Sequence, residues 1–440
     1  MKQIGIGLAG FGTVGAGVFK HLALNRALLS ERLGLTLEVR RIAVRDPKKS
    51  RSIEAPASLF TANWQEVVDD PNVQIVVELM GGIEEARALI IRAIEAGKIV
   101  VTGNKALLAE HGKEIFDLAS ARQVPVFFEA AVAGGIPIIK AVRESFVGNH
   151  IQSIHGIING TTNYILTRMT DAGIDYADAL AEAQSQGYAE ADPTLDVNGW
   201  DAAHKAIILA SLAYGTWISP SQVFVEGIEQ VTARDVAFAR KLGYRIKLLG
   251  IARRTEKGIE LRTHPTLIPE KRLLANVEGA MNAVVVHGDA VGTTLYYGKG
   301  AGAEPTASAV VADLVDVTRL HTADPEHRVP HLAFQPDSLS STPILPIEDV
   351  TSSYYLRLRV ADVTGVLANI TRILADKRIS IDALLQKESE QVDGVDKGET
   401  DIILITHETV ERNVNAAIRE IEALSTVVSQ VTKLRMEALN

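Results

Sequence analysis

The fold is decided by a short stretch near the N-terminus, Gln3-Ile-Gly-Ile-Gly-Leu8-Ala-Gly10-Phe11-Gly12-Thr13-Val14-Gly15. An apolar strand over Gln3–Leu8 runs directly into a G-x-G-x-x-G motif, and a helix is predicted to follow through Leu29. The first glycine of such a motif permits a tight turn, the second lets a pyrophosphate approach the backbone, and the third lets helix and strand pack closely. The strand-turn-helix context therefore predicts a dinucleotide-binding loop at residues 10–15.

The pattern continues as alternating strands and helices. Strands are predicted at Leu37–Val44, Gln74–Leu79, Ile99–Val101 and Val124–Phe128, with helices around Ile83–Ala96 and Ala106–Ala121. Alternation of this kind predicts an α/β fold with a doubly wound parallel sheet of the Rossmann type.

A second glycine-rich turn lies far along the chain, at Gly298–Thr306. It precedes a helix predicted over Ala307–Leu320, whose alanines and valines suit packing on the nucleotide sheet. We expect the chain to return to its first domain there, so that the turn closes over the cofactor with Gly302 and Glu304.

The end of the second strand bears on the choice of cofactor. An acid there usually binds the ribose 2′-hydroxyl of NAD, whereas an arginine accommodates the 2′-phosphate of NADP. This chain has Arg45 followed by Asp46, with Lys48, Lys49 and Arg51 nearby. The positive charge favours NADP, while Asp46 turned inward would permit NAD. A solvated basic loop is the alternative to both.

Composition limits the classes of function. A chain of 440 residues with 47% hydrophobic residues should form two or three domains. Its formal net charge of -9, without a large basic run, argues against nucleic acid or an anionic membrane surface as a partner. No apolar run is long enough to cross a bilayer. The absence of cysteine fits a reducing compartment, so we expect a cytoplasmic protein that acts on a small molecule.

The residues best suited to chemistry lie between Gly187 and Leu212. Four acids crowd a short loop there: Glu190, Asp192, Asp196 and Asp201. On the following helix Asp201 and Lys205 stand four residues apart, on one face and beside an apolar stripe. A half-buried lysine shifts its pKa readily and can donate or accept a proton, with a carboxylate to orient it. An ordinary surface ion pair is the alternative, and the spacing alone favours it.

Three other stretches are candidates for ligand contact. Lys105 follows the strand Ile99–Val101 at the edge of the sheet where ligands bind, unless it is a surface lysine at a helix start. The turn at residues 157–164 offers hydroxyl and amide groups to a ligand, or else caps a helix. In the loop Glu129–Pro137, carbonyls beside a glutamate could coordinate a hard cation, although a plain domain connection is the default interpretation.

The rest of the chain divides into a middle sheet, a linker and a C-terminal unit. Strands at Tyr244–Ala252, Ile259–His264 and Ala283–Val286 predict a mostly antiparallel sheet. Five prolines between His321 and Val350 predict a linker. Beyond it we expect strands at Tyr354–Val360, Ser380–Gln386, Ile402–Thr406 and Val427–Leu434, helices at Gly365–Asp376 and Val410–Ala423, and a mobile loop at Asp393–Thr400. This is a βαββαβ order. The C-terminal unit has no cluster of residues suited to catalysis. Ligand sensing is therefore the more specific hypothesis for this unit, and a passive role in dimerisation is the simpler one.

Several motifs together resemble one family, the homoserine dehydrogenases with a C-terminal ACT domain. The most specific are Ile158-Asn-Gly-Thr-Thr-Asn163, Gly187-Tyr-Ala-Glu-Ala-Asp-Pro193, Asp196-Val-Asn-Gly-Trp-Asp201 to Lys205, and Gly300-Ala-Gly-Ala-Glu-Pro-Thr-Ala-Ser-Ala309. The likeness covers nearly the whole length. On this basis we expect a Rossmann domain over 1–130 and 303–320, a substrate-binding and dimerisation domain over 131–302, a linker over 321–350 and an ACT domain over 351–440.

The resemblance implies the reversible reduction of L-aspartate 4-semialdehyde to L-homoserine with NADPH or NADH. Lys205 matches the family's proton donor to the nascent alkoxide, Asp201 its neighbour near the substrate, and Lys105 a lysine near both cofactor and substrate. The implied substrate pocket contains Glu190, Asp196, Thr162 and Tyr188. Glu129 and the carbonyls of Val132, Gly134 and Ile136 match a monovalent metal site, usually sodium. A lysine such as Lys205 suits the role of proton donor, because hydride arriving at an aldehyde carbon leaves negative charge on the oxygen.

The C-terminal unit adds an implied regulatory role. Asp362-Val-Thr-Gly365-Val-Leu resembles the ACT turn at which amino acids bind between paired domains. This implies feedback inhibition with threonine as the expected effector, in a homodimer or homotetramer. Two alternatives stay open: another amino-acid semialdehyde dehydrogenase on the same core, and a nicotinamide and amino-acid sensor without turnover.

Overall fold

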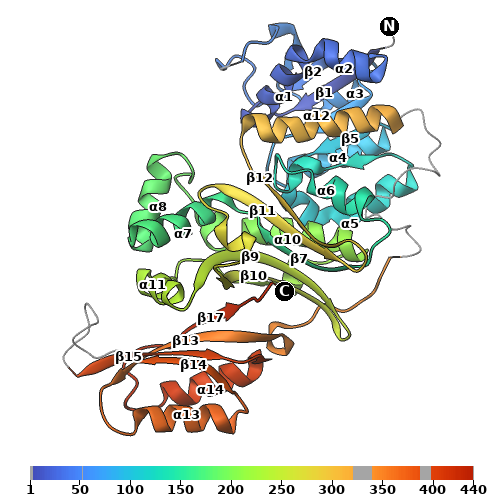
Figure 1. The fold of residues 1–440 in the computed structure, drawn as a ribbon. Helices are drawn as coiled ribbons and strands as arrows, with labels where there is room; N and C mark the ends of the chain where they lie inside the picture. Colours follow the sequence, from blue (N-terminus) through green and yellow to red (C-terminus); the bar gives the residue numbers. More distant parts are fainter. Residues whose placement is uncertain (1–2, 52, 321–338, 387–397, 440) are drawn as a thin grey trace.

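The computed structural model describes residues 3–51, 53–320, 339–386 and 398–439. They form three regions that follow one another along the length of the molecule (Figure 1). The nucleotide-binding region lies at one end, an antiparallel sheet with its helices lies in the middle, and the C-terminal unit lies at the other end. None of the described helices is long and apolar enough to span a membrane.

The first region is built on a parallel sheet, as predicted. Its strands are β1 (Gln3–Ala9), β2 (Thr36–Ala43), β3 (Phe60–Thr61), β4 (Ile75–Glu78), β5 (Ile99–Thr102) and β6 (Val126–Phe127). They are ordered β3-β2-β1-β4-β5-β6, and every neighbouring pair is parallel. The order runs outward in both directions from β1, which is the doubly wound arrangement.

Helices cover both faces of this sheet. Ile75 and Val77 of β4 pack with α1 (Thr13–Leu24) and α12 (Ala303–Leu320), whereas Val76 faces the side of α4 (Glu84–Glu95) and α5 (Lys105–Ala121). Successive strand residues point to opposite faces, so a strand buried on both sides needs the unbroken apolar run seen in the sequence.

Helix α12 lies across the first region although it follows the middle region in the chain (Figure 1). It packs against α1 so closely that a Cβ atom on Gly17 would lie 3.0 Å from the carbonyl oxygen of Ala303. The helix begins four residues before the predicted start at Ala307. The prediction of a single helix through Leu29 is wrong, because α1 ends at Leu24 and α2 (Arg26–Leu33) begins after Asn25. The first helix ends where Asn25 adopts a non-helical φ of -101° and ψ of 17°, and the Asn25 side chain donates to the carbonyl of His21 at 3.1 Å.

The middle region contains a longer antiparallel sheet than predicted. Its strands are β7 (Ile151–Ile157), β9 (Tyr244–Thr255), β10 (Gly258–Pro269), β11 (Met281–Gly288) and β12 (Gly292–Lys299), in the order β12-β11-β7-β9-β10. The edge strand β12 was not predicted. Every second residue of β12 is exposed, which gives it little apolar signal in the sequence. Helices α7 (Gly160–Ala172), α8 (Tyr176–Ser185), α9 (Thr194–Val197), α10 (Trp200–Tyr214) and α11 (Ala233–Lys241) also belong to this region.

The C-terminal unit has the predicted βαββαβ order. Its elements are β13 (Thr351–Ala361), α13 (Val366–Asp376), β14 (Ile381–Gln386), β15 (Glu399–Thr406), α14 (Glu411–Glu422) and β17 (Thr432–Met436). The last strand starts later than predicted, because Val427 makes only an isolated bridge to Val360. Residues 321–338 of the predicted linker and 393–397 of the predicted mobile loop lie outside the described residues.

Strand β17 joins the middle and C-terminal regions into one sheet of eleven strands. It pairs in parallel with β10 on one side and antiparallel with β13 on the other. The C-terminal unit is therefore fixed by backbone hydrogen bonds in addition to its chain connection.

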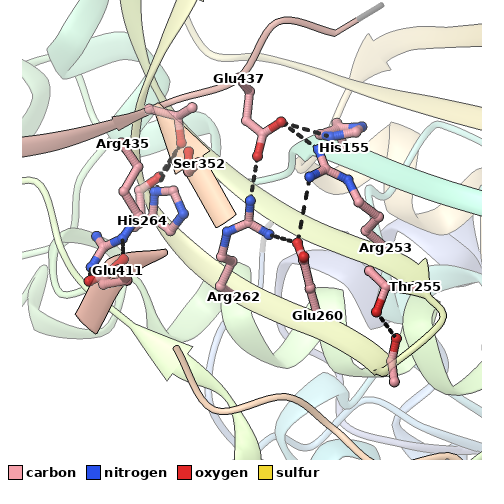
Figure 2. Close-up of polar contacts among 12 residues, drawn as sticks. His155, Arg253, Thr255, Glu260, Arg262, His264, Ser352, Glu411, Arg435 and Glu437 are labelled. Atoms are coloured by element: carbon pink, nitrogen blue, oxygen red, sulfur yellow. Dashed lines mark hydrogen bonds and ion pairs between the residues drawn. The ribbon is translucent and has the colours of Figure 1, made fainter. Parts of the chain in front are cut away.

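A buried ionic cluster follows β17 directly (Figure 2). Glu437 accepts hydrogen bonds from Arg262 of β10 and, at 2.5 Å, from Arg253 of β9. The Arg262 side chain is 1% exposed and also donates to Glu260 at 2.7 Å. Two arginines and two glutamates thus compensate one another's charge where the middle and C-terminal regions meet.

Candidate active site

Asp201 and Lys205 lie on α10, the most deeply buried helix of the middle region. The helix begins after Gly199, whose φ of 88° favours glycine, and it ends at Gly215 with a φ of 59°. Lys205 is only 9% exposed and Asp201 only 8%. The pair is therefore not a surface ion pair, and the lysine is more buried than the half-buried position expected from the sequence.

The Lys205 ammonium is held by two oxygens. Its Nζ donates to Oδ2 of Asp201 at 2.7 Å and to the carbonyl of Ile158 at 2.7 Å. Ile158 follows β7 directly, so the lysine is fixed between its own helix and the end of a central strand. An ammonium has three donors, and one remains for another acceptor.

Lys105 comes from the nucleotide-binding region and meets the same carboxylate. It is the first residue of α5, at the carboxyl end of β5, and its Nζ lies 3.1 Å from Oδ1 of Asp201. Burial lowers the pKa of Lys205, the Asp201 charge opposes that shift, and Lys105 adds to it. Burial works to raise the pKa of Asp201, but the two lysines outweigh it and hold that pKa well below its usual value. The site is thus an ionised carboxylate between two ammonium groups at the meeting point of two regions.

Asp196 joins this cluster through Asn159, which lies in the polar turn 157–164 expected to contact a ligand but was not itself named as a site residue. The Asn159 amide donates to Asp196 Oδ1 and to Asp201 Oδ2, both at 2.7 Å. The side-chain oxygen Oδ1 of Asn159 accepts from the backbone N–H and the hydroxyl of Thr162, at 2.8 and 2.9 Å. The predicted residue Thr162 therefore lies beside the cluster, with its hydroxyl turned toward Asn159. In the sequence Asn159 belongs to the motif Ile158–Asn163, and the alternative that this turn caps a helix is confirmed, because Asn159 is the N-terminal cap of α7.

The remaining predicted substrate residues are less closely connected. Tyr188 is exposed and stacks on Tyr164 with ring centroids 4.5 Å apart. Its carbonyl accepts from the Thr161 hydroxyl at 2.8 Å, which ties the loop before α9 to the start of α7. Glu190 is exposed, and its carboxylate has no hydrogen-bond or ion-pair partner among the described residues. The structure thus brings Lys205, Asp201, Lys105 and Asp196 together, but not Glu190 or Tyr188.

The glycine loop has the shape that a dinucleotide requires. A Cβ atom on Gly10 would lie 2.3 Å from the carbonyl of Leu79, and one on Gly15 would lie 2.2 Å from the carbonyl of Gly10. A Cβ on Gly12 would meet nothing within 4 Å, so the space in front of the loop is open. No side chain caps the N–H groups at the start of α1. Open space before free N–H groups fits the phosphates of a dinucleotide.

The other predicted cofactor residues lie within this loop and after β2. Phe11 is buried against the rings of Phe19 and Phe60, while Thr13 is exposed and Val14 partly buried. Arg45 is exposed at the end of β2. The Asp46 carboxylate accepts from the backbone N–H of Lys48 at 2.9 Å, so it stabilises its own turn.

The second glycine turn lies next to α1. Gly302 has a φ of 126°, which favours glycine, and it directly precedes α12. Glu304 pairs with Lys20 of α1 at 2.6 Å, and both side chains are largely exposed. The turn thus lies beside the helix that begins at the glycine loop.

Glu129 lies in a buried, turned loop. Its carboxylate accepts from the backbone N–H groups of Ile139 at 2.9 Å and Lys140 at 2.8 Å. Burial raises the pKa of Glu129 to about 7. Among the described residues, the carbonyls of Val132 and Gly134 accept no hydrogen bond, whereas that of Ile136 accepts from Ile138 N–H at 2.8 Å. The described residues contain no group of three or more His, Cys, Asp and Glu side chains that could hold a metal ion.

The fold and this site define a class of protein. A doubly wound sheet with an open glycine loop, next to a buried lysine–carboxylate cluster, defines a nicotinamide-nucleotide-dependent dehydrogenase. Family models agree along the chain: homoserine dehydrogenase, NAD binding domain, matches residues 10–129, homoserine dehydrogenase matches 137–315, and ACT domain matches 354–425. The chain belongs to the homoserine dehydrogenase family.

Individual relatives extend over the whole chain. A homoserine dehydrogenase of Pseudomonas aeruginosa is 54% identical over 440 residues, which is 100% of both chains. The crystal structure of a homoserine dehydrogenase from Thiobacillus denitrificans is 59% identical and has a TM-score of 0.94, covering 100% of this chain and 99% of that one. A hyperthermophilic archaeal homoserine dehydrogenase in complex with NADPH is 28% identical with a TM-score of 0.61, covering 72% of this chain and 98% of that one.

Proposed function

We propose that this chain interconverts L-aspartate 4-semialdehyde and L-homoserine, with Lys205 as the proton donor to the substrate oxygen. The single observation that supports this most is the Lys205 ammonium, buried and held by Asp201 and the Ile158 carbonyl at 2.7 Å each. Two of its three donors are engaged inside the protein, which leaves the third for the substrate.

Bound NADPH or NADH supplies the hydride. As negative charge develops on the aldehyde oxygen, the Lys205 ammonium stabilises it and gives up a proton. Burial lowers the pKa of Lys205 and so makes proton release easier. Asp201 keeps the ammonium oriented, and Lys105 adds positive charge beside it.

The acids near the lysine suit the amino group of the substrate. We propose that Asp196 binds the ammonium with Glu190, whose carboxylate is exposed and without a partner among the described residues. Thr162 and Tyr188 would complete the pocket, because the Tyr188 loop is tied to the start of α7 beside Thr162. A carboxylate pair suits a cationic amino group better than it suits a neutral substrate.

For the cofactor, we propose that the loop Gly10–Gly15 holds the pyrophosphate and that Arg45 contacts a 2′-phosphate. Asp46 is engaged in its own turn, which favours NADP over NAD. The turn at Gly302 and Glu304 would close over the cofactor from the side of α1.

We propose a monovalent cation, sodium in the first instance, at Glu129 and the carbonyls of Val132, Gly134 and Ile136. Two of these carbonyls accept no hydrogen bond among the described residues, and the Glu129 carboxyl, whose pKa burial raises to about 7, would supply a negative charge once it is ionised. Such oxygen ligands suit a hard cation. The cation would fix the loop between the two regions.

The C-terminal unit and the exposed edges support an oligomer under amino-acid control. Leu295 and Tyr297 are exposed on the edge strand β12, and Leu384 is exposed on β14 at the other end of the same sheet. We propose a homodimer or homotetramer, with threonine as the effector at the Asp362–Gly365 turn. The cytoplasmic location expected from the sequence stays a prediction.

A steady-state assay tests the proposed activity. With homoserine as substrate, we expect turnover with a higher kcat/KM for NADP than for NAD. A higher kcat/KM for a related hydroxy-amino acid would instead indicate another semialdehyde dehydrogenase. Binding of nucleotide and homoserine without turnover would indicate a sensor.

A further inference from the structure

Asn159 bridges two acids that lie 37 and 42 residues farther along the chain. Its amide nitrogen has two hydrogens, and it donates one bond to Asp196 and one to Asp201, each at 2.7 Å. We propose that Asn159 is a positioning residue that holds these two carboxylates together, so that Asp196 faces the substrate ammonium while Asp201 keeps Lys205 in place. This inference rests on the proposed roles of Asp196, Asp201 and Lys205.

The orientation of the Asn159 amide is fixed from the opposite side. Its carbonyl oxygen accepts from Thr162 N–H at 2.8 Å, which makes Asn159 the N-terminal cap of α7, and from the Thr162 hydroxyl at 2.9 Å. Asn159 is 4% exposed. A flipped amide would lose the cap and direct its oxygen at two carboxylates, so the donating orientation is the one that the surroundings permit.

The hydrogen bonds from Asn159 offset the repulsion between the carboxylates of Asp196 and Asp201. Burial and the negative charge of Asp201 raise the pKa of Asp196, while the hydrogen bond from Asn159 lowers it. Lys205 and Thr161 also lower the pKa of Asp196. The groups that face Asp201 are Lys205, Lys105 and Asn159. His204 is also close enough for the charge of Asp201 to raise its pKa against the lowering caused by burial. Without the amide donor, Asp196 would lose a bond that favours its ionised form, and the partly buried Asp196 and the buried Asp201 would repel each other more strongly.

Two substitutions separate this role from helix capping. Aspartate and serine both cap helices well, so Asn159→Asp and Asn159→Ser keep an oxygen for Thr162 N–H. Neither offers two N–H donors, and Asn159→Asp adds a third carboxylate to the cluster. Thr232→Ala is the matched control, because Thr232 caps α11 through Asp235 N–H and lies outside the proposed site.

The experiment measures the pH profile of kcat/KM for homoserine, the Kd for NADPH and the Tm of each variant. In both Asn159 variants we expect kcat/KM at neutral pH to fall by about 10- to 100-fold, as for a lost hydrogen bond to a charged group. The acid limb of the profile should move to higher pH, farther for Asn159→Asp than for Asn159→Ser, because an added carboxylate raises the pKa of its neighbours. The Kd for NADPH should stay unchanged. Thr232→Ala should lower Tm without moving the pH profile.

Three outcomes would overturn the inference. Wild-type kcat/KM and an unmoved acid limb in whichever Asn159 variant folds would leave Asn159 as a helix cap. Failure of both variants to fold, while Thr232→Ala folds, would make its role structural. A parallel Asp196→Asn variant tests the proposed site itself: near-normal kcat/KM there would contradict the proposed role of Asp196. Loss of kcat/KM in Asp196→Asn together with unchanged Asn159 variants would contradict only the present inference.

Discussion

The Nζ atom of Lys105 lies 3.1 Å from Oδ1 of Asp201, and the two residues come from different regions of the chain. Lys105 starts a helix of the nucleotide-binding region, whereas Asp201 lies on the buried helix α10 of the middle region. The other oxygen of the same carboxylate accepts from Lys205. The cluster is therefore complete only when the two regions are closely packed.

Replacing Asp201 should impair turnover through Lys205. In Asp201→Asn the two lysines lose the charge between them, and the pKa of Lys205 should fall because Asp201 raises it in the native protein. We expect kcat/KM for homoserine to fall by about 100-fold, as misplaced catalytic groups do, with the basic limb of its pH profile moved to lower pH. Asp117→Asn, at the exposed Lys113–Asp117 pair, is the control and should leave both unchanged. An unmoved basic limb would contradict the link between Asp201 and Lys205.

Glu129 should make stability depend on pH and on sodium. Its pKa is raised from 4.5 to about 7 in the folded protein, so the folded state retains a proton that the unfolded state loses. Stability should therefore be fully present below about pH 4.5 and decline as pH rises through 7, by about 3 kcal/mol for a shift of this size. Glu129→Gln cannot ionise, so its unfolding free energy should change less across this window. Burial and the charge of Glu129 both raise the pKa of Asp313, so the difference between the two proteins reports Glu129 together with its effect on Asp313.

The same residue allows a test of the cation by thermal unfolding. At pH 8, sodium chloride should raise the Tm of the wild-type protein above its value in choline chloride of equal ionic strength, because a ligand that binds only the folded state stabilises it. Glu129→Gln should show no such difference. Equal Tm values for the wild type in both salts would argue against a sodium site.

The buried cluster at the seam should be essential for stability. Glu437→Gln leaves Arg262, which is 1% exposed, with less compensation of its charge. Breaking a buried pair of this kind costs about 3–5 kcal/mol. Denaturant unfolding followed by circular dichroism should detect that loss, whereas Lys113→Ala at the exposed pair should change the free energy by less than about 1 kcal/mol. A loss for Glu437→Gln no larger than for the control would show that the cluster adds nothing to the seam.

Threonine should inhibit the intact chain through the Asp362–Gly365 turn. Removing the C-terminal unit is a poor test, because β17 lies between β10 and β13 and its loss would expose the edge of β10. Asp362→Ala is the better variant, and we expect it to retain basal kcat while the inhibitory concentration of threonine rises. If threonine leaves the activity of the wild-type protein unchanged, the effector assignment is wrong.

The sequence predicted what depends on neighbouring residues. The glycine loop at Gly10–Gly15 follows from a strand, a turn and a helix within one short stretch. The Asp201–Lys205 pair follows from helical spacing, although the depth of its burial does not. The same reasoning misplaced the end of the first helix, because the backbone of Asn25 leaves the helical conformation where no glycine or proline marks a break.

Features that join distant parts of the chain escaped prediction. Asn159 contacts Asp196 and Asp201 only after β7, α9 and α10 have come together. Strand β17 belongs to two regions because it pairs with both β10 and β13, and no local pattern specifies such partners. Glu190 matches a motif but lies outside the cluster, on an exposed part of the loop between α8 and α9.

The most direct test of the account is Lys205→Ala, assayed for turnover of homoserine and for NADPH binding by fluorescence titration. The account predicts loss of kcat by about 100-fold or more, as expected for a general acid, with an unchanged Kd for NADPH. Near-normal kcat in Lys205→Ala would contradict the central claim that this lysine protonates the substrate oxygen.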